Sequence, residues 1–245
     1  MKNKIKNYGF SLAEVLLAVA VLAVVVACSV PVINIKMQET TMVSKLKKTY
    51  ALLNNSYQRA LSKYGSPKYW GLIPGVKDTT TDTATFEDNE KFYLRLLEGL
   101  KYEYVADVLP PQPTNYLNNK DKAVKNPDGF ERQPIFRLSD GTTFFHSWYE
   151  KGACTSNQGT FLSCGDFTVD LNGADGPNVI GIDQFLFFYS ETGLVPVGYK
   201  GHSRTVETHC MVNDTVVYNG YGCTAWVIEK GTMPWLRGKQ VSWDD

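Results

Sequence analysis

The chain has 245 residues, and its 25 basic side chains balance its 25 acidic ones. This balance does not favour a nucleic-acid-binding protein, which would carry a strongly basic surface. Aromatic residues make up 13% of the sequence, including 14 tyrosines, which is typical of a β-rich folded domain and excludes a largely disordered chain.

The N-terminal part of the chain contains its longest apolar run. Residues 1–9 form a short polar leader that carries three lysines and ends in Gly9. Residues 10–33 are almost entirely apolar, and as a helix they would be about 36 Å long, enough to cross a hydrocarbon core of about 30 Å. Because the lysines come first, we expect a single-pass helix with a cytoplasmic leader and the rest of the chain outside.

Glu14 is the one charged residue in this apolar run. A carboxylate in a membrane helix is costly and suggests a function. Gly9, Phe10 and Glu14 at this spacing, with Pro31 further along the helix, resemble the N-terminus of the type IV pilin and type II secretion pseudopilin family. The resemblance is close over about the first sixty residues and extends to the rest of the chain only in general plan.

The resemblance implies a defined maturation. A prepilin peptidase would cleave between Gly9 and Phe10 and methylate the new amino group of Phe10. Glu14 would then pair with the Phe10 amine of a sibling subunit, as an assembly platform in the cytoplasmic (inner) membrane builds the chain into an extracellular filament. Cleavage would remove three lysines, leaving 25 − 3 = 22 basic against 25 acidic residues, a net charge of −3.

Two alternatives remain for the same stretch. Residues 25–28 resemble a lipoprotein cleavage box, in which Cys28 would become a lipidated first residue. Against this stand Glu14 within the apolar core and the still apolar residues 30–35. The second alternative is a plain uncleaved membrane anchor, in which Glu14 reaches the cytoplasmic headgroups and has no further role.

The helix is expected to continue beyond the membrane. Apolar residues recur at steps of three and four, which predicts an amphipathic helix over residues 36–64, with a bend at Pro31 and an end near Gly65. The stripe is short for a coiled-coil dimer, so contact with a core is favoured. The chain thus divides into a leader (1–9), a transmembrane or filament-core helix (10–35), an amphipathic continuation (36–64) and an extracytoplasmic globular domain (65–245).

The globular part reads as a mixture of helix and strands. We expect a polar loop at 79–85, a second helix at 86–100 and an exposed connection at 109–125. Alternating apolar residues predict strands at 135–138, 142–149, 167–171, 184–189, 194–197, 215–218 and 224–229. The predicted fold class is α+β: a long N-terminal helix, half in the membrane and half amphipathic, packed on an antiparallel β-sheet in a pilin-like arrangement.

Four of the five cysteines flank loops in the globular part: Cys154, Cys164, Cys210 and Cys223. In an exported domain such pairs indicate disulfides. Four cysteines permit three pairings, of which the local one (154–164 and 210–223) is favoured. Cys28 is expected to be unpaired in the apolar helix.

One segment is rich in oxygen ligands: Asp170, Asn172, Asp175, Asn178 and Asp183. Their spacing resembles the first half of a calcium loop but lacks its bidentate glutamate. Some pseudopilins bind calcium in a C-terminal loop, so the resemblance also favours a calcium ion here. The alternative is a set of Asx-turns that joins two strands. No other cofactor is indicated.

The sequence does not favour an enzyme. The three histidines, His146, His202 and His209, have only adjacent serines or cysteines, and no nucleophile elbow is present. We therefore expect a non-enzymatic structural subunit of a type IV pilus or a type II secretion pseudopilus. The alternative function is a membrane-anchored or Cys28-lipidated binding domain that does not polymerise.

Overall fold

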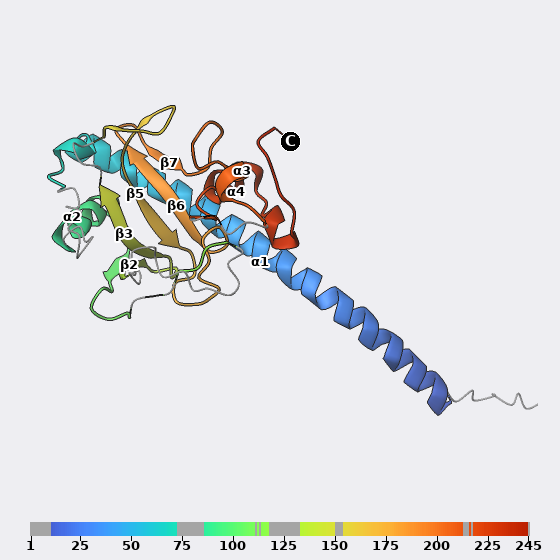
Figure 1. Cartoon of the computed structure of the whole chain (residues 1–245). Helices are drawn as coiled ribbons and strands as arrows, with labels where there is room; N and C mark the ends of the chain where they lie inside the picture. Colours follow the sequence, from blue (N-terminus) through green and yellow to red (C-terminus); the bar gives the residue numbers. More distant parts are fainter. Residues whose placement is uncertain are drawn as a thin grey trace, which may run out of the picture.

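The computed structural model has the predicted α+β class (Figure 1). It describes residues 11–72, 86–110, 112, 114–117, 133–149, 154–212, 216 and 218–244; within these ranges the side chains of residues 28, 31, 32, 86–90 and 146–149 are not described. The predicted polar loop at 79–85 lies outside the described residues.

Helix α1 (Leu12–Tyr64) is a single helix of 53 residues. Ser11 caps its N-terminus, and Gly65 ends it with a positive φ of 72°, at the position expected from the sequence. The helix continues through Pro31 without interruption. Its first half projects away from the rest of the chain, whereas its second half lies along the sheet (Figure 1).

The apolar stripe on the second half of α1 packs into the core of the domain, as predicted. Its fully or almost fully buried members are Val43, Leu46, Leu53, Tyr57 and Ala60. The hydroxyl of Tyr57 donates to the Ser190 carbonyl at 2.6 Å. The stripe therefore serves the chain's own core.

The sheet is antiparallel throughout. Its strands are β1 (Tyr102–Tyr104), β2 (Pro134–Leu138), β3 (Thr143–Tyr149), β4 (Ser156–Asn157), β5 (Leu162–Asp170), β6 (Gln184–Ser190) and β7 (Leu194–Pro196). They are ordered β1-β2-β3-β5-β6-β7, and β4 pairs with β5. Strands β2, β3, β6 and β7 were predicted to within about one residue at each end, whereas β5 begins at Leu162 and not at Phe167, and β1 and β4 were not predicted.

Strand β6 shows how the sheet is buried on both faces. Phe185, Phe187 and Tyr189 point into the main core, which α1 and α2 (Phe86–Leu96) cover. Leu186 and Phe188 point to the opposite face, where they pack in a second, smaller apolar cluster with Tyr116, Ile180, Val197 and Tyr221. The sheet face that lies away from α1 is thus covered by side chains from several segments, before and after β7.

Helix α2 is shorter than the predicted helix at 86–100. Its apolar side, with Phe92, Tyr93 and Leu96, is completely buried, as the sequence pattern indicated. It ends at Leu96, and Gly99 has a positive φ of 81° in the turn that follows. Residues 97–100, predicted as the last helical turn, form this turn instead, and β1 begins at Tyr102.

The C-terminal part contains one wrong prediction of element type. Residues 224–229 were predicted as a strand, but they lie in helix α4 (Cys223–Lys230). Their β-branched and aromatic residues suit either element, and the ends decide: Gly222 occupies the N-cap, and Gly231 takes the left-handed C-cap conformation at φ 70°. The other elements are α3 (Val206–His209) and the 3-10 helices η1 (Pro67–Tyr69) and η2 (Pro234–Arg237).

Two further predictions need correction. The connection at 109–125 was predicted to be exposed, but three of its described residues are buried: Gln112, Tyr116 and Leu117. The backbone N–H of Leu117 donates to the Asn219 carbonyl, which holds this part of the connection against the C-terminal segment. Of the predicted strand at 215–218, Tyr218 lies in a turn with φ 68°; residues 215 and 217 lie outside the described residues.

The structure contains the favoured local pairing of cysteines. Cys154 is bonded to Cys164, and Cys210 to Cys223. The second disulfide joins the end of α3 to the start of α4 and is completely buried. The side chain of Cys28 lies outside the described residues.

Candidate functional site

The first half of α1 exposes a continuous apolar surface. Leu12 is 78% exposed, Leu17 is 67% exposed and Ile33 is 53% exposed. Apolar patches of this extent on a protein surface mark sites of association. Within the part of the chain that the structure describes, which leaves out residues 1–10 and the side chains of residues 28, 31 and 32, no helix is long and apolar enough to cross a membrane.

Glu14 lies in the first turn of α1, where it forms a capping box with Ser11. The backbone N–H of Ser11 donates to Glu14 Oε2 at 2.7 Å, and the backbone N–H of Glu14 donates to Ser11 Oγ at 3.3 Å. Both residues are exposed, so the carboxylate is accessible to another partner. The cleavage residues Gly9 and Phe10 lie outside the described residues.

The junction between the two halves of α1 holds a buried carboxylate that the sequence pattern did not reveal. Glu39 is 2% exposed and accepts the backbone N–H of Met233 at 2.7 Å. Both terminal nitrogens of Arg237 also donate to it, Nη2 at 3.1 Å to Oε1. The hydrogen bonds from Arg237, with that from the Met233 N–H and the guanidinium charge, lower the pKa of Glu39 to about 2, although burial acts to raise it. We call these contacts of Glu39 with Met233 and Arg237 the Glu39 clasp; they fix η2 against α1.

The predicted calcium residues come together only in part. Asp170, at the end of β5, is completely buried: its Oδ1 accepts the backbone N–H groups of Asn172 and Gly173, and its Oδ2 accepts Gln184 Nε2 at 2.9 Å. Gln184 was missed by the sequence reasoning, although it directly follows Asp183 and opens β6.

Asp183 completes this network from the opposite side of the loop. It is completely buried and accepts the backbone N–H groups of Asn178, at 2.8 Å, and Val179, at 2.7 Å. Asp175, in contrast, has an exposed side chain, and its backbone carbonyl is the group that bonds to the Asn172 amide. The loop therefore forms Asx-turns around two buried carboxylates.

Three amide side chains lie around the carboxylates: two have a buried oxygen without a hydrogen-bond partner, and the third can be oriented in two ways. Asn172 Oδ1 and Gln184 Oε1 are buried without a hydrogen-bond partner. The amide of Asn178, oriented with its nitrogen inward, donates to Asp170 Oδ2 at 3.2 Å and to the Gly173 carbonyl at 3.1 Å; oriented the other way, its oxygen faces these two oxygens.

The two carboxylates also influence one another electrostatically. Burial and the nearby Asp183 carboxylate raise the pKa of Asp170 to about 7, and burial raises the pKa of Asp183 as well. Among the described residues, however, no group of three or more His, Cys, Asp or Glu side chains could hold a metal ion. Any cation here would depend on amide and carbonyl oxygens beside the two carboxylates.

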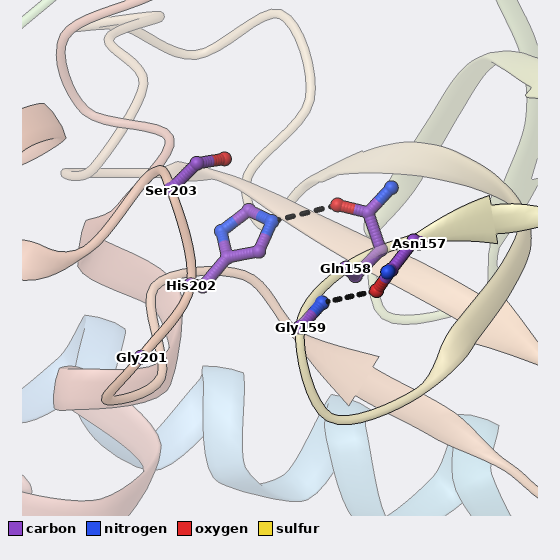
Figure 2. Close-up of a pocket in the computed structure, with 6 residues that line it drawn as sticks. All are labelled: Asn157, Gln158, Gly159, Gly201, His202 and Ser203. Atoms are coloured by element: carbon purple, nitrogen blue, oxygen red, sulfur yellow. Dashed lines mark hydrogen bonds between the residues drawn. The ribbon is translucent and has the colours of Figure 1, made fainter.

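A polar hollow of about 370 Å³ lies beside the smaller apolar cluster, where its lining residue His202 packs against Phe188. Two loops line it, with Asn157, Gln158 and Gly159 on one and Gly201, His202 and Ser203 on the other (Figure 2). His202 and Gln158 face each other and are hydrogen-bonded at 2.8 Å, whereas Ser203 points away from them (Figure 2).

Comparison with known proteins adds no relative: no protein-family model, no curated protein and no solved structure matches the chain.

Proposed function

We propose that the chain is a structural, non-enzymatic subunit of a type IV pilus or a type II secretion pseudopilus. In this role the first half of α1 packs against the same helix of sibling subunits in the filament core. The observation that carries the proposal is the projecting half of α1 (Figure 1), on which the large apolar side chains that the structure describes between Leu12 and Ile33 are exposed. An apolar surface of this size gains stability when a partner helix removes it from water.

The membrane part of the proposal rests on the sequence, in which the apolar run extends over residues 10–33 and includes positions outside the described set. Before assembly the chain would be anchored in the cytoplasmic membrane with the domain outside. Its partners would be a prepilin peptidase, an assembly platform and sibling subunits. The two disulfides support an oxidising compartment for the domain.

Replacing Glu14 with glutamine is expected to abolish assembly without disturbing the helix. Glutamine preserves the capping box with Ser11, but it has no charge to pair with a cation. Because an unpaired carboxylate in an apolar bundle is costly and a paired one is stabilised, we expect at least about a tenfold loss of surface filaments. The measurement is the amount of sheared filament at equal cellular levels of the subunit.

Ser11→Ala is the matched control, since it removes the cap and retains the Glu14 charge. Loss of an exposed cap costs about 1 kcal/mol, so filaments should persist. If Glu14→Gln assembles normally, or if both variants fail equally, the charge of Glu14 has no role in assembly and the helix cap is sufficient to explain this residue.

The mass of the mature N-terminus separates the proposed function from its alternatives. A chain that begins at N-methylated Phe10 supports processing as a pilin. A chain that begins at a lipidated Cys28 would replace the proposal with a surface-tethered binding domain, and an intact Met1 would leave an uncleaved anchor. Intact-mass and peptide mass spectrometry on protein from its own membranes makes this distinction.

We propose in addition that a calcium ion binds between Asp170 and Asp183. Calcium takes six to eight oxygen ligands, and five side chains here could contribute to such a set: two carboxylates, the unpartnered oxygens of Asn172 and Gln184, and the amide of Asn178 if it turned its oxygen inward. A cation would also favour the ionised form of Asp170, which burial otherwise disfavours.

Asp170→Asn is expected to stabilise the calcium-free protein and to remove its response to calcium. The raised pKa of Asp170 means that its contribution to stability is complete below the unfolded value near 3.8 and is lost as pH rises through about 7. At about pH 8 the variant should gain about 1 to 4 kcal/mol. The new amide nitrogen takes the place of Oδ2, and once Gln184 turns its amide over, Gln184 Oε1, which has no partner in the parent, can accept from it.

Melting temperatures with calcium and with a chelator give the readout. Calcium should raise the melting temperature of the parent more at pH 8 than at pH 5, and it should leave Asp170→Asn unchanged. Asp183→Asn is the control, because both oxygens of Asp183 accept backbone N–H groups and the substitution must destabilise. A parent that does not respond to calcium at pH 8 has a closed network of Asx-turns and no ion site.

A further inference from the structure

The side chain of His202 joins the two loops of the polar hollow. One loop covers residues 157–161, from the last residue of β4 to the start of β5, and the other covers residues 198–204, between β7 and α3. His202 is 5% exposed, and its ring lies edge-on to Phe188 on β6 and against Tyr199, with ring centroids 5.2 Å apart in each case.

Both ring nitrogens of His202 are engaged in hydrogen bonds of opposite sense. The backbone N–H of Arg204 donates to Nδ1 at 3.0 Å, so Nδ1 must carry a lone pair. Nε2 must then carry the proton, which it donates to Gln158 Oε1 at 2.8 Å. The neutral Nε2–H tautomer is therefore the form that satisfies both bonds.

The Gln158 side of this contact is fixed by the rest of its loop. Gln158 Nε2 donates to Ser156 Oγ at 2.8 Å, so the amide presents its oxygen to His202. The hydroxyl of Tyr199 also bonds to the Gln158 carbonyl, and a Cβ on Gly159 would lie 3.2 Å from the Gly201 carbonyl. The loops are thus closely apposed, and His202 lies at their contact.

We propose that His202 is a proton-operated latch, which holds the 157–161 and 198–204 loops together when neutral and releases them when protonated. Protonation places a hydrogen on Nδ1, directly against the N–H of Arg204, so this bond within the 198–204 loop must break, whereas Nε2–H could still donate to Gln158. The charged ring would then be buried beside the positive charges of Arg204 and His209, and because a buried charge without a counter-charge is costly, the ring is displaced from the contact between the loops. The consequence is a wider hollow beside the smaller apolar cluster. This inference does not depend on the proposed filament function.

The charges around His202 also favour its neutral form. Burial, with the positive charges of Arg204 and His209, lowers the pKa of His202. Of the nearby charged groups, Arg204 stacks on Tyr218 and Tyr221, and Lys200 is paired with Asp244 at 2.5 Å. No carboxylate among the described residues is hydrogen-bonded to His202. Because the lowered pKa favours the neutral form, the latch holds at neutral pH and loses stability as pH falls below the unfolded value of about 6.5.

Hydrogen exchange on the full chain in detergent tests the latch. Between pH 7.5 and pH 5.0, after correction for the intrinsic exchange rate, the two loops should lose at least about tenfold in protection while β5 and β6 stay protected. His202→Asn accepts the Arg204 N–H but cannot be protonated, so its loops should show no such change. His209→Asn should retain the parent's response.

Histidine NMR on the ¹⁵N-labelled parent gives a second reading that needs no variant. The latch requires the Nε2–H tautomer of His202 at pH 7.5 and a titration below the usual range, in step with the loss of loop protection. An Nδ1–H tautomer, loops equally protected at both pH values, or a pH response that persists in His202→Asn would each overturn the proposal.

Discussion

Replacing Gly198 with alanine is expected to prevent stable folding of the domain. Gly198 has φ 103°, and a Cβ there would lie 1.9 Å from the Gly222 carbonyl oxygen. The backbone of Gly222 has no room to move away, because it is itself packed against Thr205: a Cβ built on Gly222 would lie 2.3 Å from the Thr205 carbonyl oxygen. Strain and overlap together should cost at least about 4 kcal/mol, a large part of a typical domain stability.

Gly201→Ala is the matched control in the same segment. Gly201 has a similar φ of 91°, but no atom lies within 4 Å of its Cβ position. It should therefore show the conformational cost alone, about 1 to 2 kcal/mol. Chemical denaturation of the two variants separates backbone strain from steric overlap. Equal destabilisation would mean that the close approach of residues 198 and 222 is not present in solution.

Removing Arg237 is expected to be the most damaging change at the junction of α1 with the domain. In Arg237→Ala the Glu39 carboxylate stays buried with the Met233 N–H and the exposed Lys36 as its remaining partners. An ion pair that loses one member leaves an uncompensated charge, and because Arg237 is 37% exposed we expect roughly 2 to 4 kcal/mol.

The double variant Glu39→Ala/Arg237→Ala should be more stable than Arg237→Ala alone, since it removes the stranded charge. This sign distinguishes a charge effect from loss of packing, which would make the double variant worse. Urea denaturation at neutral pH measures all three proteins.

The Glu39 clasp also predicts a dependence on acid. The pKa of Glu39 is lowered to about 2 from an unfolded value of 4.5. Its stabilising contribution is therefore complete above about pH 4.5 and is lost as pH falls through about 2. The difference in stability between the parent and Glu39→Ala should shrink over this window. A constant difference down to pH 2 would show that the carboxylate is not held by Arg237.

Much of the fold was predictable because its signals are local. The end of α1 at Gly65 and the apolar side of α2 each follow from residues a few positions apart. Local signals failed where they were ambiguous: the apolar residues of α4 suit a strand equally well, and the glycines at its two ends were decisive.

The candidate sites were less predictable, since they depend on contacts between distant residues. The sequence placed Asp170 and Asp183 together in one loop, but it also included Asp175, whose side chain turns to solvent. It missed Gln184, which contacts Asp170 only because β5 and β6 are paired in this register. His202 was dismissed as a catalytic residue, and its partner Gln158 lies 44 positions away.

The sequence by itself determined the long N-terminal helix, its apolar first half with Glu14, the antiparallel character of the domain and the positions of its cysteines. These features depend on periodicity, caps and turns, which act over a few residues. Only the tertiary structure decided that Glu39 meets Arg237, that Gly198 crosses Gly222 and that His202 bridges two loops. Such contacts are fixed by how the helix, the sheet and the C-terminal segments pack, and no local pattern encodes which distant side chain will complete a buried polar group.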